Sequence, residues 1–92
     1  GNQIQLVDVL EYHDANVVED VQKRAQIEQI RKNIRNILSE REYYIISRRY
    51  GLFGEKECTQ REISKGLGIS RSYVSRIEKK ALDKLKNFVG CS

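Results

Sequence analysis

The stretch TQREISKGLGISRSYVSRIEKKALDKL, residues 59–85, decides the fold. Its apolar residues recur at the three- and four-residue spacings of amphipathic helices, and Gly68 interrupts them where a turn needs a positive φ angle. Ser64 is small enough for a second helix to cross close to it, and Ile69 fills the space under the turn. The pattern predicts a helix-turn-helix at about residues 60–86, which buries Ile63, Leu67, Val74 and Ile77 between its helices.

Capping patterns predict where the other helices begin and end. Thr59 and Ser39 are each followed three residues later by Glu, and such a pair caps a helix by reciprocal hydrogen bonds to backbone amides. Gly51 is expected to end the helix that follows Ser39, in the left-handed conformation that Gly adopts easily. Ser70 is expected to cap a last helix over about residues 71–88.

The first half of the chain has a less regular pattern. Apolar spacings of three and four predict a helix of about 20 residues from Val17 to Leu38. Residues 4–10 alternate in part and are predicted to be extended, and residues 13–16 are predicted to form a turn. The loop between the two capped helices has two expected apolar anchors, Leu52 and Phe53.

Together these patterns predict an all-α fold, a small bundle of about four helices with a C-terminal helix-turn-helix. The chain has 92 residues, which suffices for one domain. We expect residues 1–16 to form an acidic linker or arm, and residues 17–92 to form a single helical domain. No apolar run approaches the roughly 20 residues of a membrane span, so no membrane contact is expected. Because the chain contains no Met, we expect it to be a fragment or a processed product.

Charge is divided unevenly along the chain. Residues 1–30 carry six acids and two bases, whereas residues 31–92 carry 15 bases and seven acids. A segment as basic as residues 31–92 attracts polyanions, and nucleic acid is the commonest polyanion of the cytosol. The charge therefore fits a nucleic-acid-binding protein and a solvated, lysine-rich surface equally well.

The sequence shows no arrangement suited to catalysis, to a metal or to a cofactor. His13 is the single histidine, and the chain has no Gly-rich phosphate loop and no Cys/His metal spacing. We expect Cys58 and Cys91 to be free thiols in a reducing cytoplasm, and one bridge between them is the alternative. The pattern indicates a cytoplasmic binding protein rather than an enzyme.

The last predicted helix has two distinct faces. Its apolar stripe comprises Val74, Ile77, Ala81, Leu85 and Phe88. The opposite stripe is polar and basic, and comprises Arg71, Ser72, Ser75, Arg76 and Lys79. A recognition helix enters the major groove with its N-terminal end, and an Arg there donates bidentately to guanine. The backbone amides that follow Ser70 also suit a phosphate. The alternative is a basic face that only contacts solvent.

Part of the chain also resembles a known family, through the segments Ser39–Glu42, Arg49–Gly51 and 59–85. They are similar to region 4, the C-terminal promoter-binding region of bacterial sigma-70-type RNA polymerase sigma factors. Residues 69–79, ISRSYVSRIEK, resemble the mother-cell sporulation sigma factors most closely. The resemblance is good over residues 39–88, and residues 4–30 resemble the preceding linker more loosely. It implies a domain that reads the −35 promoter element on core RNA polymerase, in transcription initiation during sporulation.

The resemblance also implies roles for individual residues. Base contacts are implied for Arg71, Ser72, Ser75 and Arg76, and phosphate contacts for Arg41, Arg49, Thr59, Ser70, Tyr73, Lys79 and Lys80. Housekeeping sigma factors carry an acid at the position of Ser72 and a glutamine at that of Arg76, so we expect a different promoter preference. The alternative for Arg41 and Arg49 is surface ion pairing with Glu42 or Glu40.

Two protein partners are implied in the same way. A groove near Leu38, Tyr44 and Ile45 is expected to receive a helix of the polymerase β-subunit flap, and an anti-sigma factor binds the same surface in the family. These three residues are core residues in the alternative interpretation. The acidic arm, with Asp8, Glu11 and Asp14, is expected to imitate nucleic acid in a polymerase channel or else to be a disordered tail.

Two rival functions stay open from the sequence. The helix-turn-helix also suits the output domain of another transcription regulator, such as a response regulator that binds paired half-sites as a dimer. The basic face also suits an interaction module that binds an acidic protein.

Overall fold

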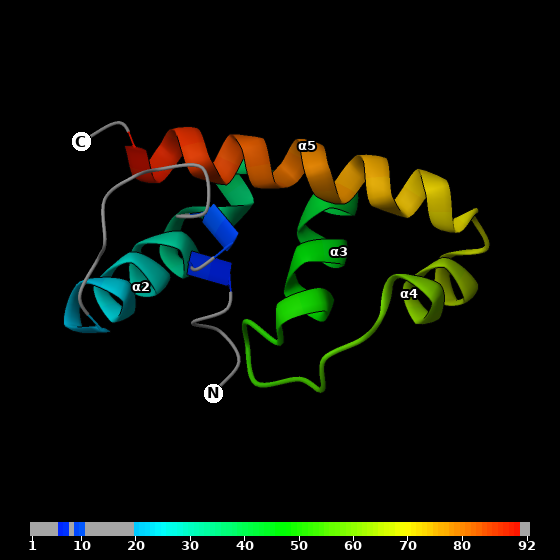
Figure 1. The fold of residues 1–92 in the computed structure, drawn as a ribbon, viewed down its shortest axis with the longest axis horizontal. Coiled ribbons are helices and arrows are strands. Elements are labelled where there is room, and N and C mark those ends of the chain that lie inside the picture. Colours follow the sequence, from blue (N-terminus) through cyan, green and yellow to red (C-terminus); the bar gives the residue numbers. More distant parts are fainter. Residues whose placement is uncertain (1–5, 8, 11–19, 91–92) are drawn as a thin grey trace.

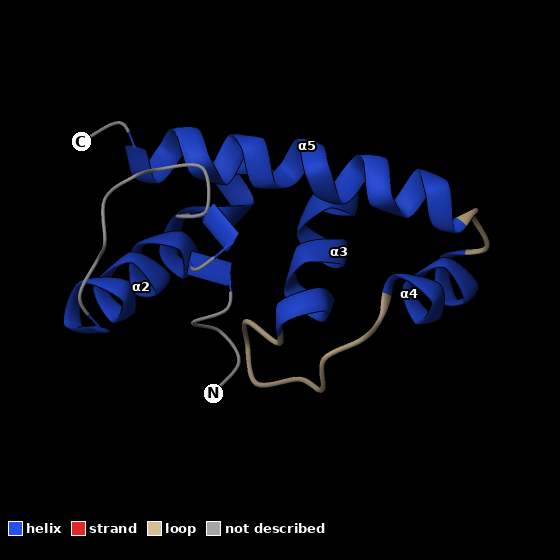
Figure 2. Cartoon of the chain, viewed as in Figure 1, coloured by secondary structure: helices blue, strands red, loops and turns tan. Residues whose placement is uncertain are grey.

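The computed structural model describes residues 6–7, 9–10 and 20–90 of the chain. These described residues form helices joined by loops and turns, with no strand (Figure 2). The helices are α2 (Asp20–Ile37), α3 (Glu40–Tyr50), α4 (Gln60–Leu67) and α5 (Arg71–Gly90), and residues 6–7 and 9–10 are helical as well. The predicted all-α class with about four helices is confirmed. Within the described ranges, no helix combines the length and apolar character that crossing a membrane requires.

Helix α5 runs along the length of the molecule, and α2, α3 and α4 lie along one side of it (Figure 1). Its C-terminal half packs on α2, its middle on α3 and its N-terminal end on α4. Each of the three shorter helices therefore contributes to the position of α5.

The apolar side chains gather in two clusters. The larger one joins the N-terminal residues to α2, α3 and the C-terminal half of α5, and includes Ile30, Ile34, Ile46, Ala81 and Leu85. The smaller one consists of Ile45, Ile63 and Val74, with Leu67, Ile69 and Ile77 packed against it. The second cluster is the core of the predicted helix-turn-helix, which is thereby confirmed.

The prediction for residues 4–10 was wrong where the structure describes them. Leu6, Val7, Val9 and Leu10 are helical rather than extended. Leu6 and Val7 are 0% exposed and Leu10 is 5% exposed, so these side chains belong to the larger core cluster. Spacings of one and four place the three on one helical face, but a segment this short shows too few repeats to reveal the period. Residues 13–16 and Val17, where a turn and a helix start are predicted, lie outside the described residues.

The predicted helix caps are confirmed. Ser39 accepts a hydrogen bond from the Glu42 amide while the Glu42 carboxylate accepts one from the Ser39 amide, and Thr59 forms the same box with Glu62. Gly51 ends α3 with φ +56°, and Gly68 ends α4 with φ +69°. A Cβ atom at Gly51 would lie 2.7 Å from the Glu55 carbonyl oxygen, so close approach as well as conformation requires glycine there.

The loop between α3 and α4 differs in part from its prediction. Leu52 is 0% exposed and is an anchor as expected, and its carbonyl oxygen accepts a hydrogen bond from Arg31 Nε at 2.7 Å. Phe53 is 47% exposed and is not an anchor. Its ring lies 5.9 Å from the ring of Tyr43, at the surface. Cys58, at the end of this loop, is a free thiol, and Cys91 lies outside the described residues.

An ion pair between a buried carboxylate and a partly exposed lysine joins α3 to α5. Lys84 Nζ lies 2.7 Å from Glu42 Oε1, and Glu42 is 4% exposed. Burial acts to raise the pKa of Glu42, but hydrogen bonds from Lys84 and Ser39 outweigh burial and hold that pKa below its usual range. A carboxylate with a lowered pKa stabilises the fold above its unfolded-state pKa and loses this contribution as pH falls.

The first test concerns the N-terminal residues. Leu6→Ala should lower the free energy of unfolding by about 2–5 kcal/mol, because it opens a cavity in the larger core cluster. Val9→Ala is the matched control, since Val9 is 40% exposed, and it should change stability by less than about 1 kcal/mol. Urea unfolding of both variants measures the difference. Equal, small effects would mean that this segment is not part of the folded domain.

The second test concerns the Glu42–Lys84 pair. Glu42→Gln should lower the free energy of unfolding by about 1–2 kcal/mol at neutral pH, since Lys84 loses its charged partner. The difference from wild type should shrink as pH falls through the lowered pKa of Glu42, because the wild-type carboxylate is protonated there and Lys84 loses its charged partner as well. Urea unfolding over a pH series measures both effects. Glu28→Gln, which removes an exposed pair with Arg31, should cost less than about 1 kcal/mol. A Glu42→Gln deficit that persists in acid would contradict this account.

Candidate nucleic-acid interface

The polar stripe of α5 faces away from the body of the protein. Its residues are exposed, as are their neighbours: Arg71, Ser72, Tyr73, Ser75, Arg76, Lys79 and Lys80. Val74, Ala81 and Leu85 are each 0% exposed on the opposite side of the helix. The division into a buried apolar face and an exposed basic face is therefore as predicted, and α5 offers a surface that a nucleic-acid groove can accept.

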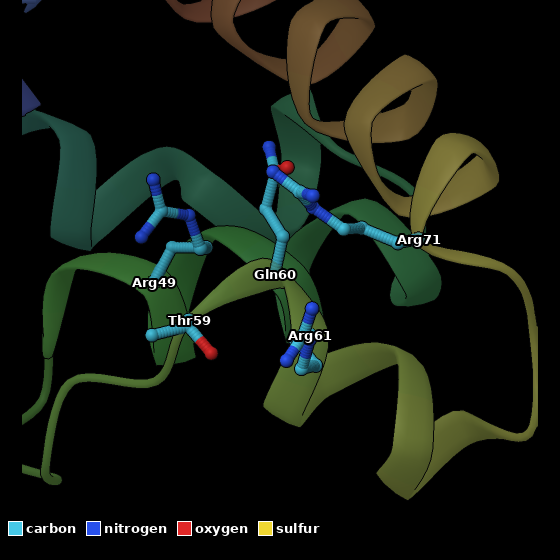
Figure 3. A pocket seen from close by; sticks show the side chains of 5 residues that line it. All are labelled: Arg49, Thr59, Gln60, Arg61 and Arg71. Atoms are coloured by element: carbon cyan, nitrogen blue, oxygen red, sulfur yellow. The ribbon is translucent and has the colours of Figure 1, made fainter.

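A depression of about 450 Å³ lies beside the start of α5, and is lined by Arg49, Thr59, Gln60, Arg61 and Arg71. The lining residues come from the end of α3, the start of α4 and the start of α5. In Figure 3 the Arg71 side chain extends from α5 toward Gln60, while Arg49 lies on the far side of Gln60 and Arg61 lies below it. We call this depression the arginine pocket.

The arginine pocket has the electrostatics of an anion site. Three guanidinium groups line it, and a guanidinium stays protonated in proteins. Thr59, the N-cap of α4, and Arg71, the first residue of α5, place the N-termini of two helices at its edge. Unpaired amides at a helix N-terminus favour a phosphate. The pocket can therefore hold a backbone phosphate beside the exposed face of α5.

Arg49 has a partner inside the protein. Its Nε lies 2.7 Å from Glu78 Oε1, and its Nη1 donates to the Cys58 carbonyl oxygen at 3.4 Å. Neither Glu42 nor Glu40 pairs with it, so the alternative predicted for Arg49 named the wrong acids. Burial acts to lower the pKa of Arg49, and the hydrogen bond and charge of Glu78 raise it overall. Arg49 is thus a fixed cation at the wall of the arginine pocket.

The other predicted phosphate contacts lie at separate places. Arg41 is exposed near the start of α3, and Thr59 is exposed at the edge of the arginine pocket. Ser70 accepts a hydrogen bond from the Tyr73 amide at 3.1 Å and so caps α5 as predicted. The structure brings Arg49, Thr59 and Arg71 together and leaves Arg41 apart from the pocket lining.

Sequence reasoning missed Gln60 and Arg61, which also line the pocket. A signal for both was present, because they directly follow the capping residue Thr59. Side chains in the first turn of a helix lie next to its free amides, so polar residues there can bind the same anion as the amides.

Two of the three residues predicted to lie near a polymerase groove are core residues, as in the alternative interpretation. Leu38 is 6% exposed and belongs to the larger core cluster, and Ile45 is 0% exposed in the smaller one. Leu38 lies in the connection between α2 and α3, and Ile45 lies on the inward face of α3. Tyr44 is half-buried, and the Arg48 guanidinium lies 4.4 Å from its ring centroid. The acidic residues Asp8, Glu11 and Asp14 lie outside the described residues.

Comparison with known proteins places the chain among transcription factors. Residues 36–87 match the family Sigma-70, region 4. The chain is 52% identical over 85 residues to the RNA polymerase sigma-28 factor of Bacillus thuringiensis subsp. kurstaki, covering 92% of this chain and 35% of that protein. It is 51% identical over 85 residues to the RNA polymerase sigma-K factor of Bacillus subtilis (strain 168), covering 92% of this chain and 29% of that protein.

A third relative is the RNA polymerase sigma-E factor of Clostridium acetobutylicum, 40% identical over 90 residues, covering 94% of this chain and 36% of that protein. The chain therefore spans about a third of the length of the curated relatives that it matches. No solved structure matches it significantly.

The pocket can be tested with DNA of mixed sequence. Arg61→Ala should weaken DNA binding about fivefold. It should also reduce the steepness with which the logarithm of the association constant falls with the logarithm of the salt concentration by about 0.9, because one phosphate contact is lost. Lys32→Ala removes the same charge from an exposed position on α2, outside the pocket lining, and should change affinity less than about twofold. Fluorescence anisotropy with a labelled duplex over a salt series measures both. Equal losses in the two variants would show that net charge, not the pocket, binds the duplex.

Proposed function

We propose, because this chain belongs to the sigma-70 region 4 family, that it binds the −35 element of promoters and directs RNA polymerase to them. The observation that carries the proposal is the exposed basic face of α5, which lies within the matched residues 36–87. The relatives support a place in a sigma factor of the sporulation type. The work of the domain is then recognition rather than catalysis.

The proposed recognition divides the residues into two groups. Arg71, Ser72, Ser75 and Arg76 face the base edges when the N-terminal half of α5 enters the major groove. The phosphates on either side are held by Arg49, Gln60 and Arg61 of the arginine pocket and by Thr59, Ser70, Tyr73, Lys79 and Lys80. Phosphate contacts position the helix, and base contacts select the sequence. Ser72 and Arg76 depart from the housekeeping pattern, so the selected element differs from the housekeeping one.

One recognition helix reads only about three to four base pairs, so the isolated domain binds weakly and with strong salt dependence. In the cell, core RNA polymerase supplies the remaining affinity by holding other parts of the sigma factor on the same promoter. The proposed role implies that the protein acts in the cytoplasm. A polymerase contact on α3 is supported only by the half-buried Tyr44, and the same surface is open to an anti-sigma factor.

The proposal is tested by selecting duplexes from a randomised pool with the 92-residue chain and measuring the stoichiometry of the complexes. An asymmetric element bound by one chain supports a promoter-reading sigma domain. A palindrome bound by two chains would instead support a dimeric regulator such as a response regulator output domain. Absence of any sequence preference, with the chain folded, would refute promoter recognition.

Substitutions on α5 should separate base from phosphate contacts. Arg71→Ala and Arg76→Ala should each cost about 1–3 kcal/mol of binding free energy on the selected element and relax the preference at one position. Lys80→Ala should weaken binding to the selected element and to mixed-sequence DNA by the same factor. Affinities measured on a set of single-base variants of the element decide this. A uniform loss for all three variants would refute the assigned roles.

A further inference from the structure

Glu78 is a buried acid at the meeting point of three helices. It is on α5 and only 7% exposed. Its Oε1 accepts hydrogen bonds from Arg49 Nε of α3 at 2.7 Å and from Gln60 Nε2 of α4 at 3.2 Å. The pKa of the adjacent Tyr50 is raised to about 12, first by burial and then by the charge of Glu78. One carboxylate thus connects α3, α4 and α5.

The position of this acid is electrostatically unfavourable for a DNA-binding protein. Two of its donors, Arg49 and Gln60, line the arginine pocket. A negative charge directly behind an anion site weakens the attraction for a phosphate, and burial of a carboxylate adds a desolvation cost. If this position only contributed to the positive charge that attracts DNA, a neutral or basic residue would therefore suit it better than Glu.

The geometry gives Glu78 a different role. One oxygen of the carboxylate, Oε1, accepts hydrogen bonds from both the Arg49 guanidinium and the Gln60 amide. It thereby holds side chains from two helices as parts of one pocket wall. Arg71 stands seven residues before Glu78 on the same helix, about two helical turns away. The same carboxylate therefore also sets the position of α5, and of Arg71, relative to the start of α4.

We propose that Glu78 is a positioning residue for DNA recognition, which holds Arg49 and Gln60 so that the arginine pocket is preformed for a backbone phosphate. This inference rests on the proposed promoter-binding function. Preorganisation removes the cost of ordering these side chains when the phosphate arrives, so it acts on affinity without Glu78 touching the DNA. Glu78 thereby links the packing of the three helices to the geometry of recognition.

The decisive experiment is Glu78→Gln in the 92-residue chain, tested on a mixed-sequence duplex and on the selected element. If only charge matters, removing a negative charge strengthens binding to a polyanion. If Glu78 positions the pocket, binding weakens about tenfold on both duplexes, by loss of a charge-assisted hydrogen bond. The slope of log K against log salt should also fall by about 0.9, since one phosphate contact is lost. The two accounts therefore predict changes of opposite sign.

Three variants serve as controls. Asp83→Asn removes a negative charge from an exposed position of the same helix and should leave affinity within about twofold of wild type. Glu78→Asp keeps the charge but shortens the reach, and should weaken binding as Glu78→Gln does. Glu42→Gln breaks the other ion pair between α3 and α5, so it should lower stability while leaving the salt slope unchanged. Thermal unfolding confirms that each variant is folded at the assay temperature.

The outcomes separate this inference from the proposed function. Folded Glu78→Gln that binds as tightly as wild type or more tightly, with the wild-type salt slope, overturns the positioning role. If Glu78→Gln does not fold, Glu78→Asp decides the question by the same two readouts. A wild-type chain that prefers no sequence over the mixed duplex overturns promoter recognition instead, and this is seen before any variant is compared.

Discussion

The burial of one face of α5 against three shorter helices is the constraint on which the rest of the structure depends. Val74, Ala81 and Leu85 are fully buried along that face, and the opposite face is left to solvent. A chain of this size has a small core, so the loss of a single large side chain is a substantial part of its stability. One face of α5 therefore packs the core and the opposite face is available for recognition, so a change in the packing of α5 also moves its exposed face.

Two buried carboxylates, Glu42 and Glu78, fix how α3 and α5 are positioned relative to each other. Apolar contacts between helices tolerate sliding, whereas the bonds from Lys84 to Glu42 and from Arg49 to Glu78 have fixed partners and geometry. Each pair joins α3 to α5, one near the start of α3 and the other near its end. The angle between these helices is thus specified at two points, which the apolar clusters alone do not ensure.

Features that depend on neighbours in the chain were predictable from the sequence, and those that depend on tertiary contact were not. The caps at Ser39 and Thr59 and the turn at Gly68 follow from local backbone chemistry, so they were predicted correctly. The burial of Leu6 requires the groove formed by distant helices, and the exposure of Phe53 depends on the path of its loop. The arginine pocket combines residues of three helices. The sequence could therefore indicate some of these residues individually as phosphate contacts, but it could not predict that they form one pocket.

The placement of the two apolar clusters also determines how a mechanical load would pass through the domain. Leu6 shares its cluster with Leu85, whereas Arg71 begins the same helix about 20 Å away. Tension applied through the N-terminal residues is therefore borne at the C-terminal half of a rigid rod, while the smaller cluster secures the other half. A pull on residues 6–10 would therefore reach the C-terminal half of α5 directly, and the end that carries Arg71 only through the length of the helix.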